Sequence, residues 1–141
     1  YDDLSTFKLY ALDVGLLRQL SELDASVLLL STPGYMEYKG ALAENYVLQS
    51  LTAQFQASFR YWTSGNKAEV DFLLQYDNHI YPIEVKADQN VTGKSLIQYE
   101  KLFQPVYRIR YSMLNLKQDG NLINIPLFLA DKTKELLKDK S

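Results

Sequence analysis

Residues 68–87 read AEVDFLLQYDNHIYPIEVKA. Each half alternates with the period of two that is typical of a β-strand, so that one face of each strand is apolar. Residues 76–78, Tyr-Asp-Asn, favour a tight turn between the halves. The stretch therefore predicts an antiparallel hairpin. Its second strand raises a question, because Glu84 and Lys86 stand among residues suited to a buried strand.

The alternation also predicts which charged side chains lie together. Asp71 leaves the first strand on the face opposite Val70 and Phe72, and Glu84 and Lys86 share one face of the second strand. Asp71 lies thirteen residues before Glu84. A chain that folds back at the turn brings these two carboxylates side by side. We therefore expect Asp71, Glu84 and Lys86 to point at one spot on the sheet.

The segments around the hairpin predict an α/β domain with a mixed sheet. The central order is a helix at about 37–55, a strand at 59–64, the hairpin, a helix at 93–103 and a strand at 106–113. A further strand at 121–130 and a C-terminal helix capped by Asp131 are expected to follow.

A Pro-Gly loop signal at residues 31–38 divides the chain. We expect residues 1–36 to form an N-terminal extension, a short strand and then a helix that begins near Asp13, packed on the main body at residues 37–141.

The first long helix carries an acidic residue on its apolar face. Glu44 shares this face with Ala41, Val47 and Leu51. A carboxylate there is unfavourable unless another group compensates for the lost solvation. Gly40, one turn earlier, is expected to leave room for another backbone. Glu44 would reach the other carboxylates if this helix packs over that edge of the sheet.

Converging carboxylates beside a lysine suit a hard divalent cation. Magnesium takes oxygen ligands in near-octahedral geometry and usually keeps several waters. We predict that Asp71 and Glu84 are ligands of Mg²⁺ or Mn²⁺, and that Asp71, Glu84, Lys86 and Glu44 form a site for phosphodiester chemistry. The alternatives are a solvated Glu84–Lys86 couple, a cross-strand ion pair of Asp71 with Lys86, and a local partner for Glu44.

The overall composition narrows the function classes. The 141 residues fit one domain and include no cysteine, which excludes disulfides, zinc ribbons and thiol chemistry and fits a reducing compartment. No apolar run is long enough to span a membrane, and no signal peptide is present, so we expect a cytoplasmic protein without a membrane partner. Because the chain starts without methionine, we expect it to be a piece of a longer protein.

The charge is unevenly distributed along the chain. Acidic residues outnumber basic ones in residues 1–100, and the reverse holds in residues 101–141. A basic footprint over the whole domain is therefore absent, but a local basic face from the C-terminal third is compatible with this distribution. Four residues are candidates for phosphate contacts, with a solvated strand edge and ordinary loop positions as the alternatives: Ser64, Lys67, Arg108 and Arg110.

The pattern resembles the PD-(D/E)XK nuclease superfamily, with its restriction-endonuclease-like core of helix, three strands, helix and strand. Asp71 corresponds to the aspartate of the motif, Glu84-Val85-Lys86 to its E-x-K, and Glu44 to the acidic residue of the first helix. Val70 stands where the motif has proline. The Q-x-x-x-Y element of some members is not cleanly present at Gln98.

Four longer segments are similar, in order and spacing, to the C-terminal domain of a group of bacterial and archaeal AAA-type ATPases. They are FKLYALDVGLL, KGALAENYVLQSL, RYWTSGNKAEVDFLL and YPIEVKA. This resemblance implies an ATPase domain upstream as the partner of this chain. The phosphate-binding loop G-x-x-x-x-G-K-[ST] is absent from the sequence, so ATP would bind only to that upstream domain.

Three functions follow as hypotheses. The first is a metal-dependent nuclease that hydrolyses DNA. The second is a catalytically inactive module of the same fold that binds nucleic acid or a protein partner and regulates the attached ATPase. The third is a structural or oligomerisation domain, which the many tyrosines and the C-terminal helix would serve.

Overall fold

A computed structural model of the chain describes residues 33–65, 68–87 and 93–140. Six strands and three α-helices form its described part, together with one 3₁₀ segment. In chain order they are α2 (Pro33–Phe55), β1 (Arg60–Thr63), β2 (Glu69–Tyr76), β3 (His79–Val85), α3 (Lys94–Phe103), β4 (Arg108–Ser112), β5 (Lys117–Asp119), β6 (Leu122–Pro126), η2 (Leu127–Lys132) and α4 (Thr133–Lys138). The predicted central order of helix, three strands, helix and strand is confirmed.

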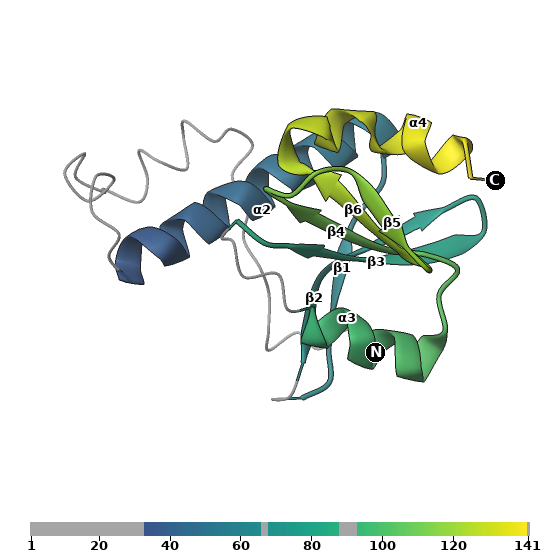
Figure 1. Cartoon of the computed structure of the whole chain (residues 1–141), viewed down its shortest axis with the longest axis horizontal. Coiled ribbons are helices and arrows are strands. Elements are labelled where there is room, and N and C mark those ends of the chain that lie inside the picture. The colour runs from purple at the N-terminus through teal and green to yellow at the C-terminus, as the bar shows by residue number, and fades with distance from the viewer. Residues whose placement is uncertain (1–32, 66–67, 88–92, 141) are drawn as a thin grey trace.

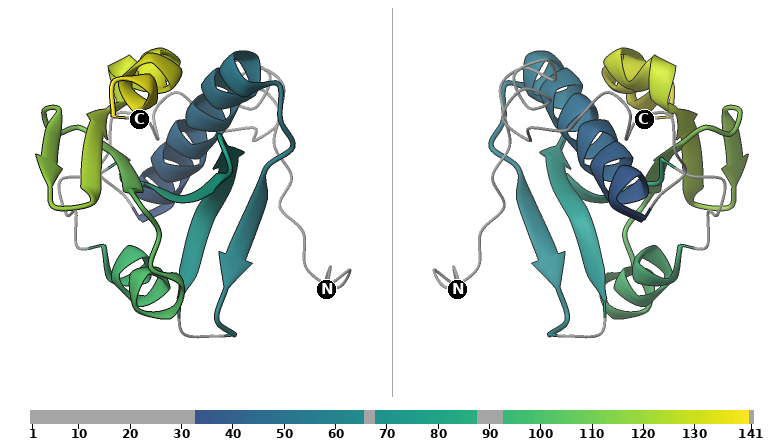
Figure 2. Two further views of the ribbon diagram at one scale, coloured as in Figure 1. Left: turned by 90° about the vertical axis from the view of Figure 1, so that its right-hand side faces the viewer. Right: turned by 90° about the vertical axis from the view of Figure 1, so that its left-hand side faces the viewer.

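The strands form one mixed sheet in the order β1-β2-β3-β4-β6-β5. The pairs β1–β2, β2–β3 and β5–β6 are antiparallel, whereas β3–β4 and β4–β6 are parallel. Helix α2, η2 and α4 cover one face of the sheet, and α3 covers the other (Figures 1 and 2). Because both faces are covered, residues 81–85 of β3 are buried on both faces, whereas His79 and Ile80 at its start are exposed.

The β2–β3 hairpin forms as the sequence predicts. Asp77 and Asn78 have φ values of 49° and 61°, the left-handed conformation that both central residues of a type I′ turn require. Aspartate and asparagine accept this conformation more readily than other non-glycine residues. The turn fixes the register so that Tyr76 faces His79 and Phe72 faces Ile83.

The main core lies between the sheet and the layer of α2, η2 and α4. Val47 and Leu51 of α2 pack there against apolar side chains from β2, β3, β4 and β6. The hydroxyl of Tyr111, which is fully buried, is satisfied by Thr133 at 2.5 Å. A smaller cluster under α3 joins Leu96 and Tyr99 to the sheet.

Trp62 belongs to the layer under α3. Its ring meets the rings of Tyr99 and Phe103 edge to face, with centroid distances of 5.3 and 5.9 Å.

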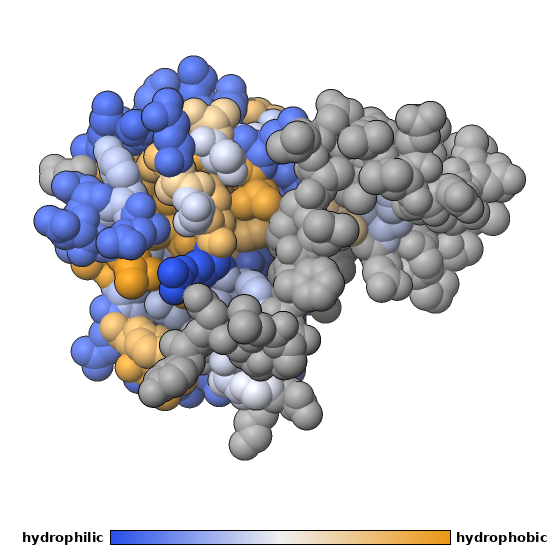
Figure 3. All heavy atoms as spheres, turned by 180° about the vertical axis from the view of Figure 1, so that it is seen from behind, coloured by the Kyte–Doolittle hydropathy of each residue, from blue (hydrophilic) through white to orange (hydrophobic). Residues whose placement is uncertain are grey.

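Apolar side chains also reach the surface, where they lie between polar regions (Figure 3). Several of them are on α3 and on the loop after β4: Ile97, Leu102, Phe103, Met113, Leu114 and Leu116.

Helix α2 differs from the prediction in two respects. It begins at Pro33, so residues 33–38 are helical and the predicted loop is wrong there. Proline suits the first position of a helix, because its φ is already helical and its missing N–H would have no partner. Ala41 is exposed and does not share the buried face. A Cβ on Gly40 would meet no described atom within 4 Å, so no described backbone approaches closely there.

The C-terminal part also differs. Strand β6 ends at Pro126, which has no N–H to donate, and the chain continues as 3₁₀ turns. Lys132, not Asp131, occupies the N-cap of α4, and its side chain makes no capping bond. Strand β5 was not predicted, because its three residues are all exposed and carry no apolar signal. The predicted strand and helix before residue 33 lie outside the described residues.

No helix in the described part of the chain is long and apolar enough to cross a membrane.

The packing of the main core allows a prediction of how much stability a core substitution removes. Leu51→Ala removes a fully buried side chain from the contact between α2 and the sheet. We expect a loss of about 2–5 kcal/mol in the free energy of unfolding, because a cavity adds to the lost transfer energy. Urea unfolding measures it, with Gln49→Ala, an exposed site on the same helix, as the control. Equal losses in both variants would contradict the assigned packing.

Candidate functional site

The site begins where β2 and β3 stop pairing through their backbones. The last backbone pair in their register is Phe72 with Ile83. One residue further, the Oδ2 atom of Asp71 accepts a hydrogen bond of 2.8 Å from the backbone N–H of Val85. The carboxylate thereby takes the place of a ladder partner. This bond fixes Asp71 beside the C-terminal end of β3, as the hairpin geometry predicted.

Glu84 is the central residue of the site. Its residue exposure is only 4 %, although it carries a carboxylate. Oε1 lies 3.3 Å from Nζ of Lys86, while Oε2 is buried and has no hydrogen-bond partner among the residues that the structure describes. A buried oxygen without a partner is costly, and such atoms need a physical explanation.

Gly93 determines the space around the unpartnered oxygen. A Cβ built on this residue, which is the N-cap of α3, would lie 3.2 Å from Oε2 of Glu84. The Cβ of any other residue at this position would be in tight steric contact with the carboxylate of Glu84. The glycine therefore lets the start of α3 approach Glu84 closely, and Glu84 faces the α3 side of the sheet.

Burial and the neighbouring charges act on the pKa of Glu84 in opposite directions. Burial raises its pKa above the ordinary glutamate value, and the neighbouring charge of Asp71 raises it further. Lys86 and Arg110 act in the opposite direction without cancelling the effect of burial. The ionised carboxylate is thus under-compensated, and a cation would be favourable beside it.

Glu84 also starts a polar row across the sheet. The register pairs Glu84 with Arg110 of β4, Arg110 with Asn124 of β6, and Asn124 with Lys117 of β5. Residues paired in this way on neighbouring strands point to the same face. The row therefore runs on the α3 side from the carboxylates to two cations.

Asn124 connects this row to the loop after β4. Its Oδ1 accepts hydrogen bonds from Nε of Arg110 at 3.0 Å and from Oγ of Ser112 at 2.7 Å. Its Nδ2 donates to the carbonyls of Leu114 and Asn115. Asn124 is 4 % exposed. A buried amide with all these bonds holds both the guanidinium and the loop in fixed positions.

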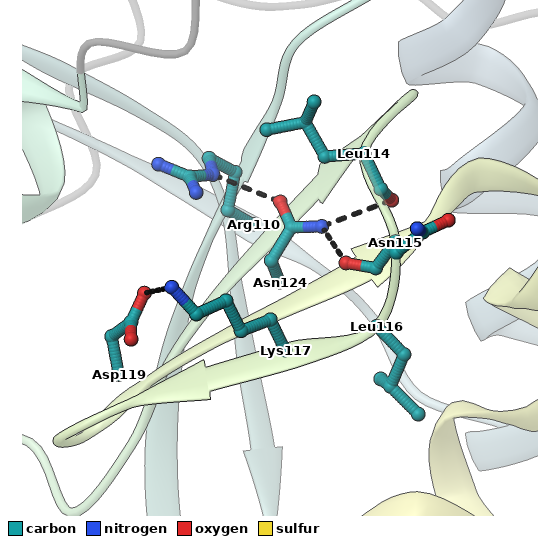
Figure 4. A pocket seen from close by; sticks show the side chains of 7 residues that line it. All are labelled: Arg110, Leu114, Asn115, Leu116, Lys117, Asp119 and Asn124. Carbon is teal, nitrogen blue, oxygen red and sulfur yellow. Dashed lines mark hydrogen bonds and ion pairs between the residues drawn. The ribbon is translucent and has the colours of Figure 1, made fainter.

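A pocket of about 210 Å³ opens over this part of the row. Arg110, Lys117, Asp119 and Asn124 line it together with residues 114–116 (Figure 4). The ammonium of Lys117 is 3.2 Å from Asp119, and both side chains are mostly exposed. The pocket thus combines cationic groups with two exposed leucines at its rim.

Two predicted phosphate contacts have other roles here. The guanidinium of Arg108 donates from Nε and Nη2 to Oδ1 of Asn121 and pairs with Glu100 at 3.1 Å, and its side chain is 11 % exposed. It is therefore a structural link between α3, β4 and the turn before β6. The hydroxyl of Ser64 accepts a hydrogen bond from Gln98 of α3. Lys67 lies outside the described residues.

Glu44 is half-buried on α2. That helix packs on the apolar face of β3, which contains Ile83, whereas Glu84 points to the α3 side. The charges that act on the pKa of Glu84 come from Lys86, Asp71 and Arg110. The structure therefore brings Asp71, Glu84 and Lys86 together, and a role for Glu44 stays a prediction.

The carboxylates do not form a complete metal cage by themselves. Within residues 33–65, 68–87 and 93–140, no group of three or more His, Cys, Asp or Glu side chains could hold a metal ion. Asp71 and Glu84 are a pair of carboxylates. Magnesium is commonly bound through one or two carboxylates, waters and substrate phosphates, so this pair fits such an ion only in part.

Residues 39–128 match a family that is described as Domain of unknown function (DUF4143). The chain belongs to this family. The matched range of this DUF4143 chain includes Asp71, Glu84, Lys86 and the whole polar row. No curated protein and no solved structure matches the chain.

Sequence reasoning missed Asn124, Lys117 and Gly93 in the DUF4143 chain. Asn124 had a readable signal, since a polar residue inside the apolar run LINIP is unusual for a buried strand. Lys117 had no readable signal in the sequence, because its position beside Asn124 depends on the pairing of a short polar strand. Gly93 gave none either, since its role depends on where α3 packs.

The raised pKa of Glu84 predicts a pH-dependent stability difference. Below the ordinary glutamate pKa, Glu84 is neutral in both folded and unfolded chains. As the pH rises, the unfolded chain releases this proton at the ordinary glutamate pKa, whereas the folded chain keeps it until the raised pKa is reached. The wild type therefore loses stability between these two pKa values, and the loss is complete above the folded-state pKa. Glu84→Gln has no such proton to lose. We expect the variant to melt higher at neutral pH, by about 4 °C per kcal/mol gained, and no difference in acid.

Thermal unfolding followed by circular dichroism between acidic and neutral pH measures this difference. Glu69→Gln, which changes an exposed carboxylate on the same hairpin, is the matched control and should show no such trend. A variant that melts below the wild type at neutral pH would mean that ionised Glu84 is well compensated in the fold.

Proposed function

We propose that this DUF4143 domain is a divalent-metal-dependent nuclease domain with a restriction-endonuclease-like core, which hydrolyses DNA phosphodiesters. We further propose that it forms the C-terminal part of an AAA-type ATP-binding protein. The observation that carries the proposal is the buried Oε2 of Glu84, which has no hydrogen-bond partner in the described part of the chain although Asp71 and Lys86 are adjacent.

The under-compensated carboxylate is the first argument. Burial and Asp71 together disfavour the charged form of Glu84, and a cation reverses both effects. A purely structural carboxylate would be expected to have both oxygens satisfied. A buried carboxylate that lowers the stability of the fold is typical of a functional site.

The residues divide the chemistry between them. Asp71 and Glu84 would hold Mg²⁺ or Mn²⁺, which when bound polarises a phosphodiester and makes a bound water more acidic. The ammonium of Lys86 stays near Oε1 of Glu84 and can donate to charge that develops on the attacked phosphate. The hydrogen bond from Val85 fixes the orientation of Asp71, so little reorganisation is needed at the moment of reaction.

A second candidate rests on a specific observation. The described residues provide only two carboxylates at the site and no larger metal-binding group. A nuclease-like domain that has lost activity could still bind nucleic acid or a protein partner and regulate the attached ATPase. Under this alternative, Glu84 would affect stability but not binding.

A cleavage assay with Mn²⁺ or Mg²⁺ on plasmid and linear DNA separates the two candidates. Glu84→Gln should reduce the rate by about 100-fold or more, the scale of losing an essential charged group. Glu69→Gln, an exposed carboxylate on β2, is the matched control and should cut like the wild type. Equal cutting by all three proteins would refute the assigned site.

Calorimetric titration with Mn²⁺ supplies an independent measurement. Asp71→Asn keeps an oxygen that can accept from Val85, so the fold should be retained while a charged ligand is lost. We expect binding by the wild type and weaker binding by the variant. A wild type that neither binds Mn²⁺ nor cuts DNA would favour the regulatory module.

A further inference from the structure

We propose that the pocket beside Arg110 is a phosphate subsite, which holds the backbone of the nucleic-acid substrate next to the phosphodiester at Glu84. This inference deepens the proposed function and rests on it for the identity of the ligand. It assigns roles to Arg110 and Lys117 as phosphate contacts and to Asn124 as the residue that positions Arg110.

The position of the pocket is the first argument. Glu84, Arg110, Asn124 and Lys117 are register partners on four neighbouring strands. Neighbouring strands lie about 4.8 Å apart, so the pocket begins one strand spacing from Glu84 and extends roughly 10 Å further. A nucleic-acid strand that crosses the sheet in this direction would place one phosphate at the carboxylates and a neighbouring phosphate over the pocket.

The fixed orientation of Arg110 is the second argument. Its Nε donates to Asn124, which is 4 % exposed and held by Ser112 and by two loop carbonyls. The guanidinium is planar and carries its donors in a rigid fork that matches phosphate geometry. A buried amide that holds this group at the wall of a pocket pre-organises it for an anion (Figure 4).

Lys117 and the rim complete the subsite. Among the described residues, the ammonium of Lys117 pairs with the exposed Asp119, and a surface pair of this kind contributes little to stability. The ammonium of Lys117 can therefore exchange its pair with Asp119 for a contact with a phosphate. Leu114 and Leu116 are 44 % and 47 % exposed, and they offer an apolar surface to a sugar or base.

The test is the binding of a fluorescein-labelled DNA duplex with a single-stranded extension, measured by fluorescence anisotropy in EDTA. EDTA separates binding from cleavage. Lys117→Gln should weaken binding of this probe about three- to tenfold. It should also lower the slope of log K against log salt by about 0.7–0.9, the contribution of one phosphate contact.

Lys132→Gln is the matched control. Lys132 is also an exposed lysine that pairs with a nearby carboxylate, at 3.5 Å from Glu135, but it lies in η2 on the other side of the sheet. It should leave both affinity and salt slope nearly unchanged. Arg110→Lys is the second variant, since it keeps the charge and removes the fork, and it should weaken binding with a melting temperature close to that of the wild type.

The outcomes are distinguishable from those of the cleavage assay. Wild-type binding that depends on Lys117 but not on Lys132 supports the subsite even if no cleavage is found, in which case only hydrolysis is refuted. The subsite is overturned if the wild type does not bind the probe, if Lys117→Gln binds like the wild type, or if both lysine variants lose affinity equally. Cleavage that depends on Glu84 would survive each of these results.

Discussion

The register of the β2–β3 hairpin is the constraint from which the candidate site follows. The two left-handed residues Asp77 and Asn78 close a two-residue turn, and the pairing of Phe72 with Ile83 follows from it. A slip by one residue would exchange the faces of a strand. Glu84 would then enter the apolar layer under α2, and Ile83 would face α3. The turn thus determines which face carries the charges.

The parallel pairing of β3 with β4 extends this constraint to the rest of the sheet. Glu84 lies opposite Arg110, and Arg110 opposite Asn124, so one register error would remove the whole row from the α3 face. The row changes from carboxylate to cation along its length. A polyanion is repelled at one end of such a row unless a metal ion is present there, and it is attracted at the other. The cationic end of the row would therefore attract a polyanion without a metal ion, and a metal ion at the proposed site would relieve the repulsion at the carboxylates.

Local patterns predicted the hairpin, its turn and the proximity of Asp71 and Glu84, because all of these depend on alternation within 20 residues. They failed where the answer depends on distant partners. Arg108 was a candidate phosphate contact with a solvated strand edge as the alternative, whereas its guanidinium is bonded to Asn121 and Glu100. The start of α2 was misjudged because a Pro-Gly pair favours a loop, although proline is also suited to the first helical position.

The buried oxygen of Glu84 is stronger support for the proposed site than the residue pattern is. An E-x-K sequence in a strand is satisfied by a solvated pair, and Lys86 does approach Oε1. Within residues 33–65, 68–87 and 93–140, Oε2 has no hydrogen-bond partner, and Gly93 places no side chain against it. A domain kept only for its shape would lose little if Glu84 became glutamine and would gain the stability that the buried charge costs. The carboxylate is explained if something that binds to it offsets the cost of its burial, and a cation held between Glu84 and Asp71 would do so.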